Sequence, residues 1–169
     1  MDDDALVEAF EAGTVAPAQW DHRAHVRVAF VYLLRKRREV VRAKRDSRLF
    51  RSSGGARGGR SPSRPRGLRD GDVDAALERM RPGLRRLLEA FGVEDGPTRG
   101  FHETLTVAWL RVVRSAMDSY GPYADSAALL EGHPYLLDKR LMRLFYRRDR
   151  IASAEAKARF VEPDLTPLP

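Results

Sequence analysis

His22 and His25 are the first residues in the chain whose spacing suits chemistry. In a helix, residues three positions apart lie on one face about one turn apart. Two neutral imidazoles placed in this way can bind one divalent ion at about 2.0–2.1 Å. We therefore treat this pair as candidate metal ligands. The alternative is that the spacing arose by chance or belongs to histidines that form hydrogen bonds in the core.

His102 and Glu103 form a second pair, about eighty positions further along the chain. Adjacent helical residues project about 100° apart, so the two side chains can have different roles. His102 can supply a third metal ligand, and Glu103 can act as the catalytic acid or base on a metal-bound water. Glu103 can equally be an acid that favours the first turn of a helix. Without a metal, the two residues can form an acid–base pair.

Helix direction is the reason for joining the two pairs into one site. If the three main helices run up, down and up, each histidine motif lies near the start of a helix and at the same end of the bundle. Helix N-termini are partially positive, which keeps histidine neutral and favours an anionic substrate. The Arg-rich segment that follows the first main helix should then project from the opposite end.

Further side chains are candidates for the walls of a pocket beside these residues. Such side chains more often belong to a core or to a solvated surface than to a pocket. Arg147 and Arg159 can also make bidentate contacts to a carboxylate or phosphate. His133 is predicted to be a surface or capping histidine in a turn. The candidate pocket residues are Tyr32, Thr106, Trp109, Tyr146 and Arg159.

The elements that must position these residues are predicted to be helices. Apolar residues recur at helical spacing, and Gly or Pro follows most of the segments. Pro82 should kink or break its helix, and the Pro-rich end of the chain should be extended. We predict an all-α, single-domain helical bundle over residues 1–169. The predicted helices cover residues 4–11, 20–37, 72–91, 98–119, 125–130, 135–146 and 153–160.

Basic charge is concentrated in one segment. The formal net charge is +7, and residues 35–70 alone carry 14 Lys and Arg against 3 Asp and Glu. Within this segment, Ser52 to Gly67 is rich in Gly, Ser, Pro and Arg, which predicts a disordered insertion at about residues 46–71. Such a segment can bind nucleic acid non-specifically. It lacks interleaved aromatic residues between Arg51 and Gly67, which disfavours this function.

Composition excludes several classes of site. The chain has no cysteine, so disulfides, thiolate metal sites and cysteine nucleophiles are excluded. No apolar run approaches the ~20 residues that cross a bilayer, so no membrane association is expected. The acidic start of the chain, Met1 to Asp4, is unlike a signal peptide. The expected location is therefore the cytoplasm.

Three segments also resemble a family of small bacterial helical proteins of unassigned function. They are FEAGTVAPAQWDHRAHVRVAFVYL, GFHETLTVAWLRVV and ARFVEPDLTPLP. The family has a Trp-x-His-x-x-His segment, a later aromatic-His-Glu-Thr segment and a Pro-Asp-rich tail, and residues 35–72 look like an insertion relative to it. The resemblance implies that the motif positions are His22, His25, His102, Glu103 and Thr104. It implies no particular activity.

These features lead to three functional hypotheses. The first is a metal-dependent enzyme, hydrolase- or lyase-like, that acts on a small polar molecule. Its metal would be one divalent transition ion, Zn, Fe or Mn, held by His22, His25 and His102. The second is a non-catalytic binding or interaction protein with structural histidines. The third is nucleic-acid binding through the insertion. No organic cofactor is inferred.

Overall fold

The described part of the chain contains helices and connecting segments. The computed structural model describes the backbone of residues 1–51, 70–97 and 99–169, and the side chains of residues 1–43, 71–97 and 99–169. No strand occurs within these ranges. The structure therefore confirms the predicted all-α bundle.

Four helices, α1 to α4, form the main body, and shorter helices follow them. The main helices are α1 (Asp3–Ala12), α2 (His22–Arg51), α3 (Asp70–Ala90) and α4 (Glu103–Tyr120). The shorter α-helices are α5 (Ser126–Gly132), α6 (Arg148–Ile151) and α7 (Ala154–Ala158). Three 3-10 helices complete the set: η1 (Pro17–Gln19), η2 (Pro134–Leu137) and η3 (Lys139–Leu144).

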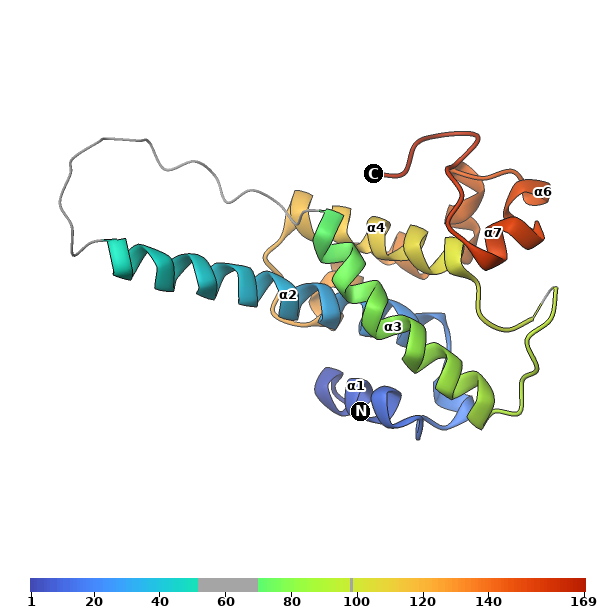
Figure 1. The fold of residues 1–169 in the computed structure, drawn as a ribbon, viewed down its shortest axis with the longest axis horizontal. Helices are drawn as coiled ribbons and strands as arrows, with labels where there is room; N and C mark the ends of the chain where they lie inside the picture. The colour runs from blue at the N-terminus through green and yellow to red at the C-terminus, as the bar shows by residue number, and fades with distance from the viewer. Residues whose placement is uncertain (52–69, 98) are drawn as a thin grey trace.

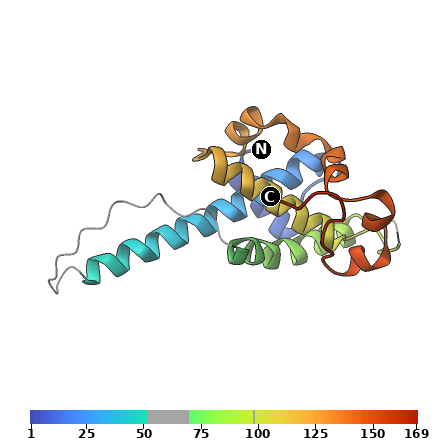
Figure 2. The same cartoon turned by 90° about the horizontal axis from the view of Figure 1, so that it is seen from above.

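The start of α2 packs between α1, α3 and α4, and the rest of α2 projects away from the body (Figures 1 and 2). α6 and α7 lie at the opposite end of the long axis, against the start of α4 (Figure 1). The core is formed by the apolar faces of the main helices. Its largest fully buried side chains include Phe10, Phe30, Leu33, Met80, Leu87, Leu110 and Met117.

Capping residues explain where several helices begin and end. The Asp2 side chain caps α1, and Gly13 ends it with a φ of 73°. The Asp21 carboxylate accepts the Ala24 N–H at 2.8 Å at the start of α2. As a result, His22 and His25 both lie in the first turns of α2, as predicted. α2 runs on to Arg51, well beyond the predicted end near residue 37.

The third main helix is continuous through Pro82, so the predicted break does not occur (Figure 1). Pro82 removes one backbone donor, but the buried residues Met80 and Leu84 on either side keep α3 packed on the core. Gly83, the next residue, has no side chain and so allows α1 to pack close to α3. A Cβ atom at this position would lie 2.2 Å from Cε1 of Phe10.

Two other predicted helices differ from the structure. α4 begins at Glu103 rather than near residue 98, because the His102 side chain is its N-cap. The segment predicted as one helix over 135–146 is divided into η2 and η3 at Asp138, whose side chain caps η3. His133 ends α5 as a capping residue, but it is buried among tyrosine rings rather than exposed.

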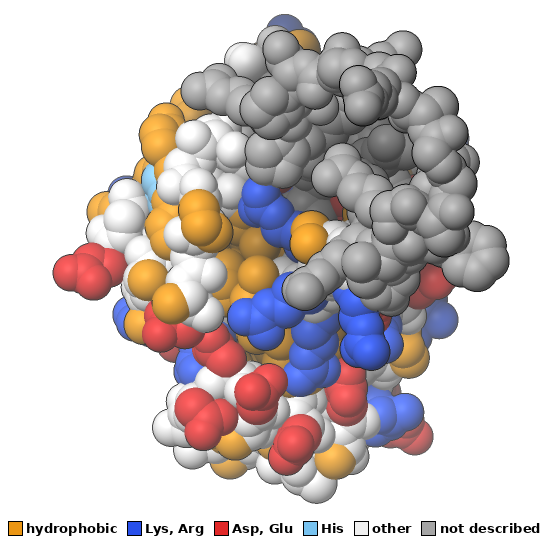
Figure 3. All heavy atoms as spheres, turned by 90° about the vertical axis from the view of Figure 1, so that its left-hand side faces the viewer, with side chains coloured by type: hydrophobic (Ala, Val, Ile, Leu, Met, Phe, Trp, Pro, Cys, Tyr) orange, Lys and Arg blue, Asp and Glu red, His pale blue; other side chains and the backbone are white. Residues whose placement is uncertain are grey.

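The described residues include no helix that is long and apolar enough to cross a membrane. The predicted disordered insertion at about residues 46–71 differs from the structure at both ends, because residues 46–51 belong to α2 and residues 70 and 71 to α3. Residues 52–69 lie outside the described residues. Figure 3 views the molecule from the end at which α2 projects. On this face, Lys and Arg side chains gather in the middle of the view and acidic side chains lie below them.

Candidate functional site

His22 and His25 lie together at the start of α2. His22 Nε2 is 3.0 Å from the Leu136 carbonyl oxygen, which can only accept, so this nitrogen carries the proton. The His22 ring also packs edge-on against Trp109 of α4, with 4.4 Å between ring centroids. The ring of His25 lies near Trp20, and its buried Nε2 has no hydrogen-bond partner. These contacts make His22 a link between α2, α4 and η2.

Burial keeps both imidazoles neutral. Burial lowers the pKa of His22, and the nearby Lys139 lowers it further, against an opposing effect of the Leu136 carbonyl. Burial lowers the pKa of His25 to about 4, with additional repulsion from His22 and Lys139. Lys139 of η3 therefore lies close enough to act electrostatically on both rings.

His102 has both ring nitrogens in use. Nδ1 accepts the Leu105 N–H at 3.3 Å and so caps α4. Nε2 lies 2.9 Å from the Ile151 carbonyl oxygen and must donate to it. Burial lowers the pKa of His102, and Lys157 lowers it further against the effect of the Ile151 carbonyl. His102 is therefore a neutral residue that joins α4 to α6, with no lone pair left for a metal.

Glu103 is held by an arginine of α3, Arg81. Nε of Arg81 donates to both carboxylate oxygens, at 3.1 and 3.0 Å, and a terminal nitrogen of Arg81 also contacts Oε1. Glu103 is 7% exposed and lines a separate small cavity with Arg81, Arg111 and Phe160. This pairing links α3 to α4, and it leaves Glu103 badly placed to exchange protons with His102.

The four residues therefore do not fit a common metal centre. The Nε2 atoms of His22 and His102 donate to different backbone carbonyls, and Glu103 is paired with Arg81. Among the residues that the structure describes, no group of three or more His, Asp or Glu side chains could hold a metal ion. The predicted metal site and its catalytic Glu103 remain predictions without support from these contacts.

The predicted pocket residues are distributed over several places. Tyr32 donates its hydroxyl to Glu11 and lines a third small cavity. Thr106 donates to the His102 carbonyl oxygen, and Trp109 packs on His22. Arg159 is paired with Glu155 at the surface. Of the five predicted residues, Tyr146 alone lines a cavity of about 950 Å³ beside the start of α4.

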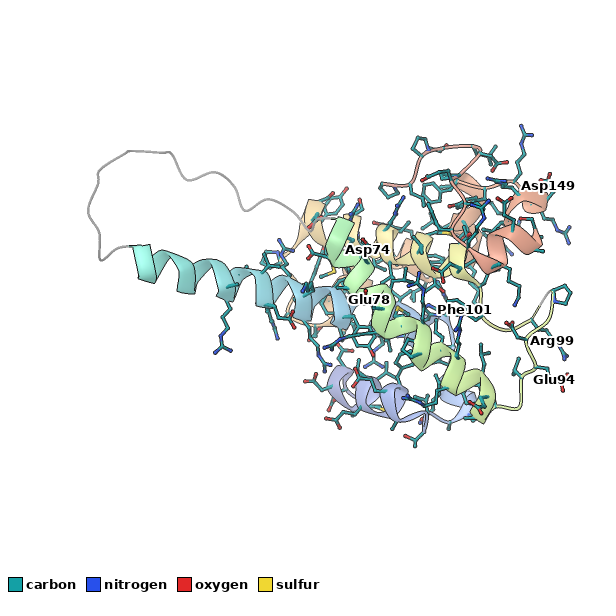
Figure 4. All side chains as sticks on the ribbon, viewed as in Figure 1. Asp74, Glu78, Glu94, Arg99, Phe101 and Asp149 are labelled. Carbon is teal, nitrogen blue, oxygen red and sulfur yellow. The ribbon has the colours of Figure 1, made fainter. Side chains whose placement is uncertain are left out.

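A cavity with a volume of about 950 Å³ lies at the N-terminal end of α4. Its walls come from the loop before α4, from His102 and Leu105, from η3, and from the segment around α6 and α7. Figure 4 labels Arg99 on this loop and Asp149 on α6, the helix that supplies Arg148 and Ile151 to the lining. We call this space the basic cavity. Its lining residues are Pro97, Arg99, Gly100, His102, Leu105, Lys139, Met142, Arg143, Tyr146, Arg147, Arg148, Ile151, Ala152, Lys157 and Leu165.

The charged residues of the basic cavity all have the same sign. The lining includes six Lys and Arg side chains, and none of the described lining residues is Asp or Glu. Lys157 is paired with Asp95. No other salt bridge between described residues involves a lining cation, which leaves Arg99, Lys139, Arg143, Arg147 and Arg148 available to a ligand.

The loop before α4 is held in place by specific contacts. Gly96 and Arg99 exchange backbone hydrogen bonds at 3.3 Å, which closes a tight turn. Gly100 follows with a φ of 86°, where a Cβ atom would meet the Asp95 carboxylate. Asp95 in turn pairs with Lys157 of α7. These contacts fix Arg99 at the edge of the basic cavity.

The sequence predicts a site where α2 and α4 begin, and the basic cavity lies beside the start of α4, but most of its lining residues were not predicted. Arg147 was identified as a possible anion contact, and it does line the cavity. The remaining cations come from a loop and from short helices with no common periodicity. The available signal was the density of arginine between residues 139 and 150, which the larger excess in residues 35–70 obscured.

Comparison with known proteins adds no family to this description. No protein-family model, curated protein or solved structure matches the chain.

Proposed function

We propose that this protein binds a small anionic molecule in the basic cavity. The observation that carries the proposal is the lining itself, six cationic side chains with no carboxylate among the described lining residues. Like charges gathered around one cavity repel each other, and an anion relieves that repulsion. The cavity is also within the usual size range of small-molecule sites, about 300–1,000 Å³.

The N-terminal end of α4 adds to the positive potential. α4 has 18 residues and is capped by His102, which lines the cavity. The partial positive charge at a helix N-terminus favours an anion nearby. Arginine predominates among the cations, and its planar guanidinium group suits bidentate contacts to phosphate or carboxylate. A phosphate or a carboxylate is therefore the expected anionic group.

Binding without catalysis is the role that the lining favours. The Tyr146 hydroxyl donates to the Val161 carbonyl oxygen at 3.0 Å, and burial raises the pKa of Tyr146 to about 12. Both nitrogens of His102 are hydrogen-bonded. The lining thus presents cations for holding an anion, while its two residues best suited to proton transfer are already engaged.

Isothermal titration calorimetry with pyrophosphate tests this proposal. We expect saturable binding to the wild-type protein, and about a tenfold or greater loss of affinity in Arg143→Gln, since a hydrogen bond to a charged group contributes about 1.5–3 kcal/mol. Arg140→Gln is the matched control, because Arg140 lies on the same short helix but does not line the cavity. Its affinity should stay within about twofold of wild type.

Two results would count against an anion site in the basic cavity. One is the absence of pyrophosphate binding to the wild-type protein at low ionic strength, where such contacts are strongest. The other is an equal loss in Arg143→Gln and Arg140→Gln, which would indicate diffuse attraction to a basic surface.

A further inference from the structure

The basic cavity has charged residues at its mouth and apolar residues at its base. Arg99, Lys139, Arg143, Arg147 and Arg148 are all exposed. Two apolar lining residues are buried, Met142 at 5% and Tyr146 at 2% exposure, and Leu105 and Ile151 are half-buried. An inorganic anion would contact the mouth and leave the apolar base uncovered.

The base also offers few hydrogen bonds to a ligand. His102 uses both ring nitrogens within the protein, and the Ile151 carbonyl oxygen accepts one of those bonds. The Tyr146 hydroxyl is engaged by Val161. A ligand with hydroxyl groups at this depth would lose hydrogen bonds to water without gaining partners in the protein. Each such group should lower the affinity about 5- to 150-fold.

An apolar edge continues this surface toward solvent. Leu165 lines the cavity and is 49% exposed, and its N–H donates to the Phe145 carbonyl oxygen. Leu144, the neighbour of Phe145, is 60% exposed. An exposed leucine that lines the cavity together with several cations can cover part of an apolar group that extends from the cavity.

We propose that the ligand is an amphiphilic organic anion, with a phosphate or carboxylate head at the arginine-rich mouth and a hydrocarbon or aromatic body against Leu105, Met142 and Ile151. This inference rests on the proposed anion-binding function and specifies the chemical class of the ligand. Apolar burial supplies the affinity, and the cations orient the head group.

A series of alkyl phosphates tests the inference, with methyl, butyl and hexyl phosphate titrated below their aggregation concentrations. Each methylene group that is fully buried contributes about fourfold in affinity. We therefore expect butyl phosphate to bind at least tenfold more tightly than methyl phosphate. Glycerol phosphate, of similar length but with hydroxyl groups, should bind no more tightly than methyl phosphate.

Leu105→Gln places a polar group in the base of the cavity and should abolish most of the gain with chain length. Leu88→Gln is the matched control, because Leu88 is a half-buried leucine on α3 that does not line the cavity. This control should keep the gain. Affinity for methyl phosphate should be unchanged in Leu88→Gln, because Leu88 lies outside the lining of the cavity.

The possible failures are distinguishable. If pyrophosphate fails to bind, the anion site itself is wrong. If pyrophosphate binds and affinity does not rise from methyl to hexyl phosphate, the anion site stands and the amphiphilic ligand is wrong. Binding to vesicles of anionic phospholipid without any chain-length dependence would assign the exposed leucines and arginines to a membrane surface, and would also overturn the inference.

Discussion

At the scale of single residues, the neutral form of the histidine rings makes the hydrogen bonds that stabilise the fold. His22 and His102 each donate Nε2–H to a backbone carbonyl in a later segment of the chain, Leu136 and Ile151 respectively. These two contacts hold η2 and α6 against the main helices. Histidine suits this role because its neutral ring donates and accepts at once. Protonation of His102 would remove its capping acceptor at the start of α4.

His25 gives a prediction about pH. Burial lowers its pKa to about 4, below the unfolded value near 6.5, so the unfolded chain takes up a proton that the folded protein resists. The free energy of unfolding should therefore be fully maintained above about pH 6.5. It should fall as the pH decreases toward 4, by on the order of 2–3 kcal/mol from this residue.

The pH effect is measured by urea unfolding of the wild-type protein and of His25→Phe between pH 4 and pH 7. His25→Phe should show a shallower decrease, whatever its stability at pH 7, because it cannot bind the proton. Residual decrease is expected from His22 and His102, whose pKa values are lowered in the same direction. Equal slopes for the two proteins would show that His25 titrates normally in the folded state.

Glu103 gives a second prediction at this scale, because its carboxylate is paired with Arg81 rather than placed for catalysis. Glu103→Gln keeps the shape and removes the charge, and we expect it to lower the free energy of unfolding by about 1.5–3 kcal/mol. Glu155→Gln is the control, since its partner Arg159 has a side chain that is 71% exposed. It should cost less than about 1 kcal/mol.

The readouts for Glu103→Gln are urea unfolding and pyrophosphate affinity. Because Glu103 lines a different cavity, affinity for pyrophosphate should be unchanged in the folded variant. A variant with wild-type stability and no ligand binding would instead place Glu103 in the binding site.

At the scale of elements, the sequence predicts a helix well where capping residues of a common type mark its two ends. The Asp2 carboxylate caps the start of α1, and Gly13 ends the helix in the left-handed conformation. Sequence rules recognise both signals. The start of α4 was mispredicted because its cap is a histidine, which those rules do not favour. The density of arginine between residues 139 and 150 is a signal for the cations of the basic cavity. The cavity itself could not be predicted, because its walls come from short segments that tertiary contacts hold in place.

Gly83 gives a prediction about the packing of α1 on α3. Gly83→Ala would place a Cβ atom 2.2 Å from the Phe10 ring, so the ring or α1 must move. Overpacking of this kind costs about 1–3 kcal/mol. Gly71→Ala, at the start of the same helix, meets no atom within 4 Å and should stabilise the protein by about 0.5–1 kcal/mol through helix propensity.

Thermal or urea unfolding of the two glycine variants decides this point, because they carry the same substitution in one helix. The opposite signs of the two changes are the expected result. If both variants gained stability, α1 would not pack against Gly83 as closely as the structure shows.

At the scale of the whole molecule, basic residues occur at two separate ends. The basic cavity lies beside α6 and α7, whereas α2 projects from the opposite end of the long axis (Figure 1). The exposed Arg38 and Arg42 lie on the projecting part of α2, and the Arg-rich residues 52–67 follow it in the sequence. The net charge of +7 therefore combines two regions that can act independently.

This separation predicts that binding of small anions and non-specific binding of nucleic acid can be removed one at a time. Gln in place of the arginines of residues 52–67 should weaken any binding of single-stranded DNA. It should also reduce the dependence of that binding on salt, by about 0.7 in log–log slope for each DNA phosphate that the protein no longer neutralises. Pyrophosphate affinity should not change. Arg143→Gln should have the reverse effects. The arginines to be replaced together are Arg57, Arg60, Arg64 and Arg66.

Fluorescence anisotropy with labelled single-stranded DNA and calorimetry with pyrophosphate measure the two activities on the same three proteins. Loss of both activities in Arg143→Gln would mean that the basic cavity is part of a nucleic-acid surface. A cavity that binds only small anions should not contribute to the binding of DNA. Loss of pyrophosphate binding in the fourfold variant would mean that residues 52–67 reach the cavity. Independent loss is expected because α2, which residues 52–67 follow in the sequence, projects at the end of the long axis opposite α6, α7 and the basic cavity (Figure 1).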